Sequence, residues 1–279
     1  MTQNPLQGYF RQTKIAVKLP SEGKFYPEGF IEFNVGDELD VKAMTAKDEL
    51  ELKNPDALLN GAAMANLLKS CVPGLKGKAD GLLVPDVSVL MLAIRFATYG
   101  DNIEFKSECP NCQTDNEFSR SIREALDNIQ ILDDEYTITL SNRLVLYICP
   151  HTFKTSNKGA RAEFEQSKIM QIVEREDMGD EEKLNQFGHV FKKMVNLNYE
   201  LVADSIAKIV TPDNEEYTDK KVIDELLREL STKEVDIIRD KIKVVNETGL
   251  STTHECKCSN CNHQWKTEGI EFDPSRFFE

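Results

Sequence analysis

Two Cys-x-x-Cys pairs constrain this chain more than any other feature of its sequence. They are Cys109/Cys112 and Cys258/Cys261, and residues 113–257 separate them. Each pair interrupts a run of alternating apolar and polar residues, which predicts a turn at the tip of a short β-hairpin. A tight turn of this kind points both sulfurs of a pair at one position, and two such turns supply four thiolates with tetrahedral geometry. The sequence therefore predicts a structural Zn²⁺ site, a zinc ribbon whose two halves lie far apart in the chain.

Three further side chains lie close enough in sequence to compete as metal ligands. Cys256 could replace Cys258, and His254 and His263 flank the second pair. The two matched pairs already complete a four-coordinate site, so the four cysteines of these pairs are the predicted ligands. Whether Cys256 or a histidine replaces one of them stays open at this point.

Other chemistries of paired cysteines fit the sequence less well. A thioredoxin-like redox motif places its Cys-x-x-Cys between a strand and a helix, whereas both pairs here lie inside hairpin-like runs. A catalytic zinc needs an open coordination position and an activating carboxylate or histidine, which nothing here specifies. His151 and His189 have no Ser, Cys or Asp partner that the sequence places beside them, so no catalytic residue is assigned. We therefore expect a protein that is not an enzyme.

Charge and composition restrict the class of partner. The chain has 48 acidic and 34 basic residues and a net charge of −14 at pH 7, which argues against broad contact with a phosphate backbone. No run of about 18 apolar residues predicts a membrane span, and no basic segment followed by an apolar one predicts a secretory signal. Seven cysteines, an odd number with four arranged for a metal, favour a reducing cytoplasm over a disulfide framework.

The sequence predicts an α+β fold with three regions. Residues 1–100 form the first, with short strands expected at 14–19, 25–33 and 40–43, and helices after Thr45, after Asn54-Pro55 and from Pro85 to Tyr99. The last of these helices leaves little polar surface, so we expect it to be buried. The zinc-ribbon halves are expected at 101–124 and 250–279.

Residues 125–249 form the third region, a hairpin around Ser141-Asn142 followed by a mainly helical insert. Apolar residues at helical spacing recur through the insert in four stripes. They are Phe164, Ile169, Ile172 and Val173; Phe187, Val190, Phe191 and Met194; Val222, Ile223, Leu226, Leu227 and Leu230; and Val235, Ile238 and Ile242. Such stripes usually form the core of their own domain.

The N-terminal residues resemble the opening signature of a known family. The segment Lys18-Leu-Pro-Ser-Glu-Gly-Lys-Phe-Tyr-Pro27, followed by Met44–Leu50 and Leu67–Val72, is similar to the baseplate hub proteins of T-even-type contractile-tailed bacteriophages. Asn4–Arg11 has the same character, and the Leu-Pro-Ser-x-Gly-x-x-Tyr core is the most specific part. The resemblance covers residues 1–120, and beyond them it is one of order and length only.

This resemblance implies a structural or assembly component that works by protein–protein contacts in the host cytoplasm. Other hub proteins are the implied partners, with the tape-measure protein as a further candidate, and no nucleic acid or membrane is expected. Self-association, and retention in the virion tail or departure after assembly, are left open. The alternative is a zinc-ribbon protein that binds nucleic acid or regulates transcription, which a contiguous basic face beside the ribbon would favour. A metal-dependent hydrolase, the third reading, would require an exchangeable water on the metal.

Overall fold

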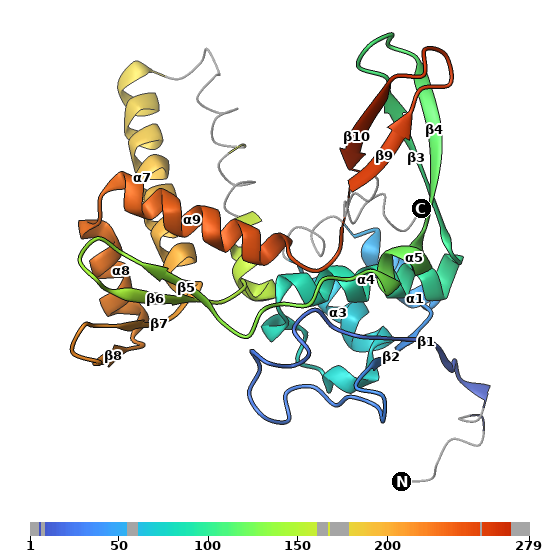
Figure 1. Cartoon of the computed structure of the whole chain (residues 1–279), viewed down its shortest axis with the longest axis horizontal. Coiled ribbons are helices and arrows are strands. Elements are labelled where there is room, and N and C mark those ends of the chain that lie inside the picture. The colour runs from blue at the N-terminus through green and yellow to red at the C-terminus, as the bar shows by residue number, and fades with distance from the viewer. Residues whose placement is uncertain are drawn as a thin grey trace. The chain divides into compact units, whose positions relative to one another are not determined.

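The computed structural model describes residues 6, 9–54, 61–160, 167, 179–251 and 253–268 (Figure 1). Helices and strands are interspersed along these residues, so the chain is a mixed α+β protein, as the sequence predicts. It divides into two compact units. Unit 1 comprises Met1–Ala79, Pro85–Leu132 and Thr248–Glu279, and unit 2 comprises Asp80–Val84 and Asp133–Glu247.

Unit 1 is built from antiparallel strand pairs and helices. In chain order its elements are β1 (Thr13–Val17), β2 (Leu39–Lys42), α1 (Ala46–Leu52), α3 (Ala62–Cys71), short 3₁₀ turns at Pro73–Leu75 and Ala79–Gly81 at its border with unit 2, α4 (Val84–Tyr99), β3 (Asn102–Glu108), β4 (Asp115–Ser121), α5 (Ile122–Asp127), β9 (Thr253–Lys257) and β10 (Gln264–Glu268). Strand β1 pairs with β2, β3 with β4 and β9 with β10. The predicted strands at 14–19 and 40–43 are thus present as β1 and β2.

The core of unit 1 lies along α3 and α4. Leu67, Leu68, Leu90, Leu92 and Ile94 are at most 1 % exposed. Complete burial of such side chains contributes about 1.5–3 kcal/mol each. The prediction that the helix from Pro85 is buried is confirmed.

Helix α1 begins where the sequence predicts a cap. The Thr45 hydroxyl accepts a hydrogen bond from the Asp48 backbone N–H at 3.2 Å, and the Asp48 carboxylate accepts one from the Thr45 N–H at 2.7 Å. This reciprocal pair is a capping box, which satisfies two backbone donors that the first turn of a helix leaves free. The helix expected after Asn54-Pro55 lies outside the described residues.

The strand predicted at 25–33 is wrong, because consecutive turns occupy this segment. Gly23 and Gly29 have φ angles of +82° and +71°, and Pro27 has no N–H to offer a neighbouring strand. Turn hydrogen bonds join Tyr26 N–H to the Gly23 carbonyl and Phe30 N–H to the Pro27 carbonyl. The alternating apolar residues pack against one another within these turns. The Tyr26 and Phe30 rings, for example, stack with their centroids 4.8 Å apart.

Unit 2 contains a four-stranded antiparallel sheet and helices. Its described elements are β5 (Tyr136–Thr139), β6 (Val145–Ile148), a helical stretch at 153–160, α7 (Asp180–Asp204), β7 (Ile206–Val210), β8 (Glu216–Tyr217), α8 (Lys220–Glu229) and α9 (Thr232–Glu247). The sheet order is β5-β6-β7-β8. The hairpin around Ser141-Asn142 is confirmed as β5 and β6, but two strands inside the expected helical insert were not predicted.

The apolar stripes of the insert differ in burial. Ile223 and Leu227 on α8 and Ile238 on α9 are fully buried and form core as predicted, whereas the prediction is wrong for Val222 on α8, which is 45 % exposed. Phe187 and Phe191 on α7 are instead 43 % and 57 % exposed, so the prediction of core is wrong for them. The stripe of Phe164 lies outside the described residues. No helix among the described residues combines the length and apolar character that a membrane span needs.

Candidate metal centre

Two β-hairpins of unit 1 carry the paired cysteines. Strands β3 and β4 pair from Asn102↔Ser121 to Glu108↔Asp115, and β9 and β10 pair from Thr253↔Glu268 to Lys257↔Gln264. Figure 1 shows the two hairpins side by side with their turns at the same end. Each Cys-x-x-Cys pair therefore lies in the turn of one hairpin, as the alternating sequence pattern predicts.

The two turns have the same hydrogen-bond pattern. In the first, Cys109 N–H donates to the Thr114 carbonyl at 3.0 Å and Gln113 N–H donates to the Cys109 carbonyl at 2.9 Å. In the second, Cys258 N–H donates to the His263 carbonyl at 2.9 Å and Asn262 N–H donates to the Cys258 carbonyl at 3.1 Å. Gln113 and Asn262 occupy equivalent positions with φ of +59° and +57°. Each hairpin thus presents its two cysteines in the same turn geometry.

The turns bring the four predicted ligands together. The Sγ atoms of Cys109, Cys112, Cys258 and Cys261 all lie within 4.8 Å of one another. The Cys112–Cys258 and Cys109–Cys261 sulfurs are separated by 3.5 Å and 3.7 Å. A tetrahedral zinc with Zn–S bonds of about 2.3 Å requires S···S separations of about 3.8 Å. The donor set and its spacing therefore fit a closed four-sulfur metal site.

Hydrogen-bond donors surround the Cys258 sulfur and favour its thiolate form. Cys258 Sγ accepts from the backbone N–H groups of Asn260 at 3.4 Å and Cys261 at 3.5 Å. The Asn116 side-chain amide lies 3.8 Å from the same sulfur, and its carbonyl oxygen accepts from Ser259 N–H at 2.9 Å. Asn116, from β4, thereby joins the two hairpins and supports a ligand, a role for which the sequence carries no local signal.

The pKa values of the thiols diverge for identifiable reasons. The hydroxyl and backbone N–H of Thr114 lower the pKa of Cys112 to about 6. The backbone N–H of Cys261 lowers the pKa of Cys258. Burial raises the pKa of Cys109 to about 11. A bound dication stabilises every thiolate that coordinates it, so metal binding at this cluster would release protons.

The competing ligands lie elsewhere in the ribbon. Cys256 is buried on β9 opposite Trp265 and is not part of the sulfur cluster. His254 packs against the ring of Phe105, and His263 stacks on Trp265. Among the described residues, the four cysteines are the ones that gather with metal-ligand spacing.

Aromatic side chains form a small core between the hairpins. Phe105 and Phe118 face each other across β3 and β4 with ring centroids 5.5 Å apart. Trp265 of β10 packs edge-on against Phe118, and its indole N–H donates to the Ser107 hydroxyl at 3.1 Å. These contacts hold the hairpins together along their length, below the sulfur cluster.

Comparison with known protein families identifies the family to which the chain belongs. A family model described as T4 bacteriophage base plate protein matches residues 12–279. The chain belongs to this family. No curated protein and no solved structure matches it. Nearly the whole base plate protein is covered, including both hairpins and all described elements from β1 to β10.

Two buried polar contacts of this base plate protein were not predicted. The first joins the Leu-Pro-Ser-x-Gly-x-x-Tyr segment to Asp86 of α4, which is fully buried. Its carboxylate accepts hydrogen bonds from the Ser21 N–H at 3.0 Å, the Ser21 hydroxyl at 2.6 Å and the Tyr26 hydroxyl at 2.6 Å. The most specific residues of the signature thus surround one carboxylate, which fixes the turn against α4.

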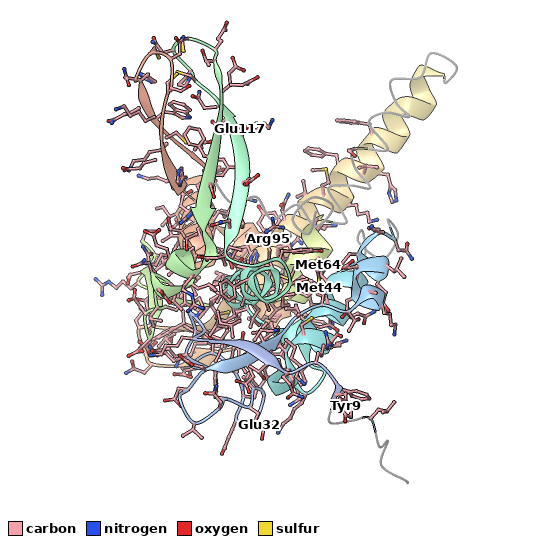
Figure 2. The ribbon with its side chains drawn as sticks, turned by 90° about the vertical axis from the view of Figure 1, so that its right-hand side faces the viewer. Tyr9, Glu32, Met44, Met64, Arg95 and Glu117 are labelled. Atoms are coloured by element: carbon pink, nitrogen blue, oxygen red, sulfur yellow. The ribbon has the colours of Figure 1, made fainter. Side chains whose placement is uncertain are left out.

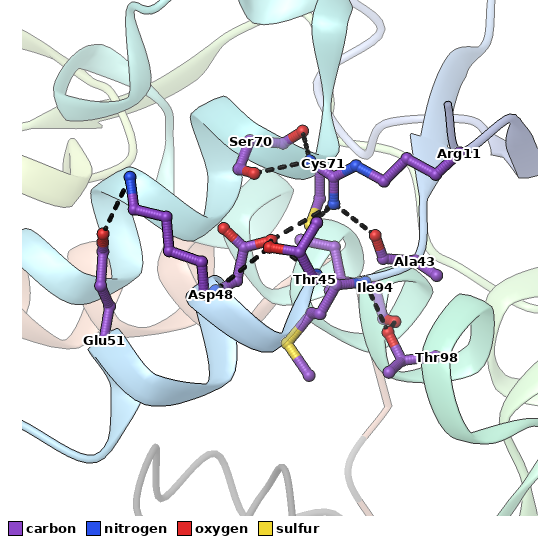
Figure 3. A network of polar contacts seen from close by, with 11 residues as sticks. Arg11, Ala43, Thr45, Asp48, Glu51, Ser70, Cys71, Ile94 and Thr98 are labelled. Atoms are coloured by element: carbon purple, nitrogen blue, oxygen red, sulfur yellow. Dashed lines mark hydrogen bonds and ion pairs between the residues drawn. The ribbon is translucent and has the colours of Figure 1, made fainter. Parts of the chain in front are cut away.

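The second contact is made by Arg11 (Figure 3). Its guanidinium donates to the Ala43 carbonyl, to the Ser70 carbonyl and hydroxyl at 2.5 and 2.6 Å, and to Asp48 at 3.3 Å. Burial alone would raise the pKa of Asp48, but hydrogen bonds from Thr45 and Ser70 and the charge of Arg11 together lower it. Arg11 thereby attaches the segment before β1 to α1 and α3.

Proposed function

We propose that this base plate protein is a structural or assembly component of the tail baseplate hub, acts through protein–protein contacts, and is not an enzyme. The family match over residues 12–279 carries the baseplate assignment. The assignment to the hub rests on the Leu-Pro-Ser-x-Gly-x-x-Tyr segment. The contacts of Ser21 and Tyr26 with buried Asp86 support a structural role for that segment.

Exposed aromatic side chains offer anchors for the proposed contacts. Tyr9 and Phe10 are 87 % and 54 % exposed, directly before the Arg11 attachment (Figure 2). The rings of Phe187 and Phe191 on α7 stack with their centroids 6.3 Å apart, and both side chains are also exposed. Aromatic residues dominate the energetics of many protein interfaces because they bury large areas at low entropic cost.

The metal in this proposal is Zn²⁺ with a structural role. A tetrahedral set of four sulfurs is typical of structural zinc sites, in which no position is left for a reactive water. The support is the cluster of Cys109, Cys112, Cys258 and Cys261. The metal would join the two hairpins without supplying chemistry.

Charge pairing on the described residues of the two hairpins does not favour the nucleic-acid alternative. Two exposed lysines of the hairpins pair with glutamates, Lys106 with Glu117 at 2.7 Å and Lys266 with Glu255 at 3.2 Å. Phosphate binding needs clustered cations free to release counterions. The charges of the described hairpin residues therefore favour a protein partner.

Affinity capture from phage-infected cells tests the proposed function. The tagged full chain should recover baseplate hub proteins, with the tape-measure protein as the further candidate, whereas recovery of DNA or polymerase would overturn the proposal. The Tyr9→Ala/Phe10→Ala and Phe187→Ala/Phe191→Ala variants test the two aromatic anchors separately. Val222→Ala, a change of a 45 % exposed apolar residue on α8, is the matched control and should capture as the unchanged chain does.

A further inference from the structure

We infer that the four clustered cysteines are also a site of disulfide formation across the two hairpins, with a small-molecule disulfide as the oxidant. The inference rests on the proposed function in one respect: the sulfurs that would hold the metal react after the metal has left. It adds a covalent form of the same junction, in which Cys112 joins Cys258 and Cys109 joins Cys261.

Two short sulfur–sulfur separations between the hairpins favour these partners. The Cys112–Cys258 pair at 3.5 Å and the Cys109–Cys261 pair at 3.7 Å each contain one sulfur from each hairpin. A disulfide bond is about 2.05 Å long, so each pair must approach by about 1.5 Å. Hydrogen bonds from Trp265 to Ser107 and from Ser259 to Asn116 join the two hairpins close to these sulfurs.

The two sulfurs of each pair differ in their access to solvent. Cys112 and Cys261 are half-buried and reach solvent, whereas Cys258 and Cys109 are buried. Each cross-hairpin pair therefore combines one sulfur that can meet a dissolved oxidant with one that is shielded from it. Thiol–disulfide exchange requires such an order, because access governs which thiol attacks first.

The reaction balances without a further reagent. The Cys112 thiolate attacks a small-molecule disulfide, a protein–small-molecule mixed disulfide forms, and one small thiolate leaves. The Cys258 thiolate then attacks the Cys112 sulfur, the Cys112–Cys258 bond forms, and the second small thiolate leaves. Two protein thiols are oxidised, one small disulfide is reduced to two thiols, and the two protons pass to those thiols. Cys261 and Cys109 react in the same way.

The two disulfide bonds keep the hairpins joined when the cysteines no longer hold a metal as thiolates. Disulfides persist outside the reducing cytoplasm, including on virion surfaces. Disulfides within one Cys-x-x-Cys turn would have the opposite effect, because each would use both sulfurs of a hairpin and leave none for the other. Disulfides between the hairpins therefore keep them joined, whereas disulfides within each turn leave them unconnected.

Tryptic peptide mapping tests the inference. The full chain is stripped of metal with a chelator, treated with oxidised glutathione, alkylated and digested. Cleavage after Lys106 and Arg120 gives one peptide with Cys109 and Cys112, and cleavage after Lys257 and Lys266 gives one with Cys258 and Cys261. The two peptides should be linked, with fragmentation showing the two predicted pairs. Unlinked peptides that have each lost two thiol hydrogens, persistent glutathione adducts, or unreacted thiols would overturn the inference.

Paired variants provide the matched control. Cys112→Ser/Cys258→Ser retains Cys109 and Cys261, one buried and one half-buried. Cys112→Ser/Cys261→Ser retains Cys109 and Cys258, both buried. The first variant should form its cross-link about tenfold faster than the second, and equal rates would contradict the assigned order of attack. Zinc content of the untreated chain is measured separately, so failure of the proposed metal role and failure of the disulfide inference are distinguishable.

Discussion

At the residue scale, unit 1 depends on two polar side chains that each make several hydrogen bonds, the fully buried Asp86 and the half-buried Arg11. Asp86 accepts three hydrogen bonds from Ser21 and Tyr26, and Arg11 donates to groups on three segments of the chain. A buried polar group is costly when one partner is removed, because the remaining group stays desolvated. The effect of a substitution should therefore exceed the worth of an exposed ion pair.

The stability contribution of Asp86 should decrease as the pH rises. Burial raises the pKa of Asp86, with the hydrogen bonds from Ser21 and Tyr26 opposing it. The folded state therefore holds the proton more tightly than the unfolded chain, whose Asp pKa is about 3.9. The contribution is complete below that value and is lost as the pH rises through the folded-state pKa, with a limiting slope of about 1.4 kcal/mol per pH unit.

Chemical denaturation from pH 4 to pH 8 checks this prediction. The difference in unfolding free energy between the unchanged chain and Asp86→Asn should fall with increasing pH across the window. Asp127→Asn, at an exposed position at the end of α5, is the control and should show no such trend. A difference that grows with pH would mean that the carboxylate is stabilised as an anion.

The planar guanidinium of Arg11, which donates several hydrogen bonds at once, should contribute more to stability than its positive charge does. A lysine at this position keeps the cation but cannot donate to Ala43, Ser70 and Asp48 together. Arg11→Lys should therefore lower the unfolding free energy by about 2 kcal/mol, nearly as much as Arg11→Met. Lys14→Met, which removes an exposed cation from β1, should change it by less than about 0.5 kcal/mol. Full stability of Arg11→Lys in denaturant titrations would assign the effect to the Asp48 ion pair alone.

At the element scale, the two hairpins have little core of their own. Phe105, Phe118 and Trp265 contact one another, but two-stranded hairpins are marginal without a further constraint. The sulfur cluster supplies that constraint if it binds a metal. The stability of β3, β4, β9 and β10 should then depend on the cysteines at their turns.

Removing one knuckle should abolish metal binding and destabilise unit 1. Cys109→Ser/Cys112→Ser leaves two thiolates, so zinc content should fall from about one per chain to near zero. The melting temperature should fall by about 2–4 °C for each kcal/mol of stability lost. Cys256→Ser is the discriminating control, because it should retain the metal if Cys256 is not a ligand. An unchanged melting temperature in the double variant would refute the structural role.

Local sequence signals account for what could be predicted at this scale. The Cys-x-x-Cys turns, the Thr45 cap and the Ser141-Asn142 hairpin are each encoded within a few residues. The segment at 25–33 was misread because its alternation is real but Gly23, Gly29 and Pro27 impose turns. Strand β7 was missed because it pairs with β6, which lies far earlier in the chain, and with β8, which is only 2 residues long.

The buried polar contacts could not be predicted for a related reason. Ser21 and Asp86 are 65 positions apart, and no local pattern links them. Arg11 likewise reaches Ser70 across 59 positions. Such contacts depend on how α4 and α3 pack against the N-terminal segment, which only the folded chain defines. The gathering of the cysteines could be predicted across a longer separation because each pair carries its own spacing rule.

At the scale of the whole molecule, the proposed metal closes a loop that contains all of unit 2 except Asp80–Val84. The entropy of closure grows as (3/2)RT ln n, so residues 113–257 cost only about 1.4 kcal/mol more than a loop of about 30 residues. Structural zinc sites contribute about 10–16 kcal/mol of binding free energy. Closing the loop around the long insertion therefore costs little free energy compared with metal binding. Loss of the metal should destabilise only the elements that the metal joins.

Hydrogen exchange of the chelated chain tests this confinement. Metal removal should increase exchange in β3, β4, β9 and β10, because opening of the hairpins then no longer competes with four metal–sulfur bonds. Exchange in α8 and α9 should stay unchanged, since Ile223, Leu227 and Ile238 are buried within unit 2. Added zinc should restore protection of the hairpins alone. Increased exchange throughout α8 and α9 would instead show that the two units unfold as one cooperative system, and the junction would then stabilise the entire chain.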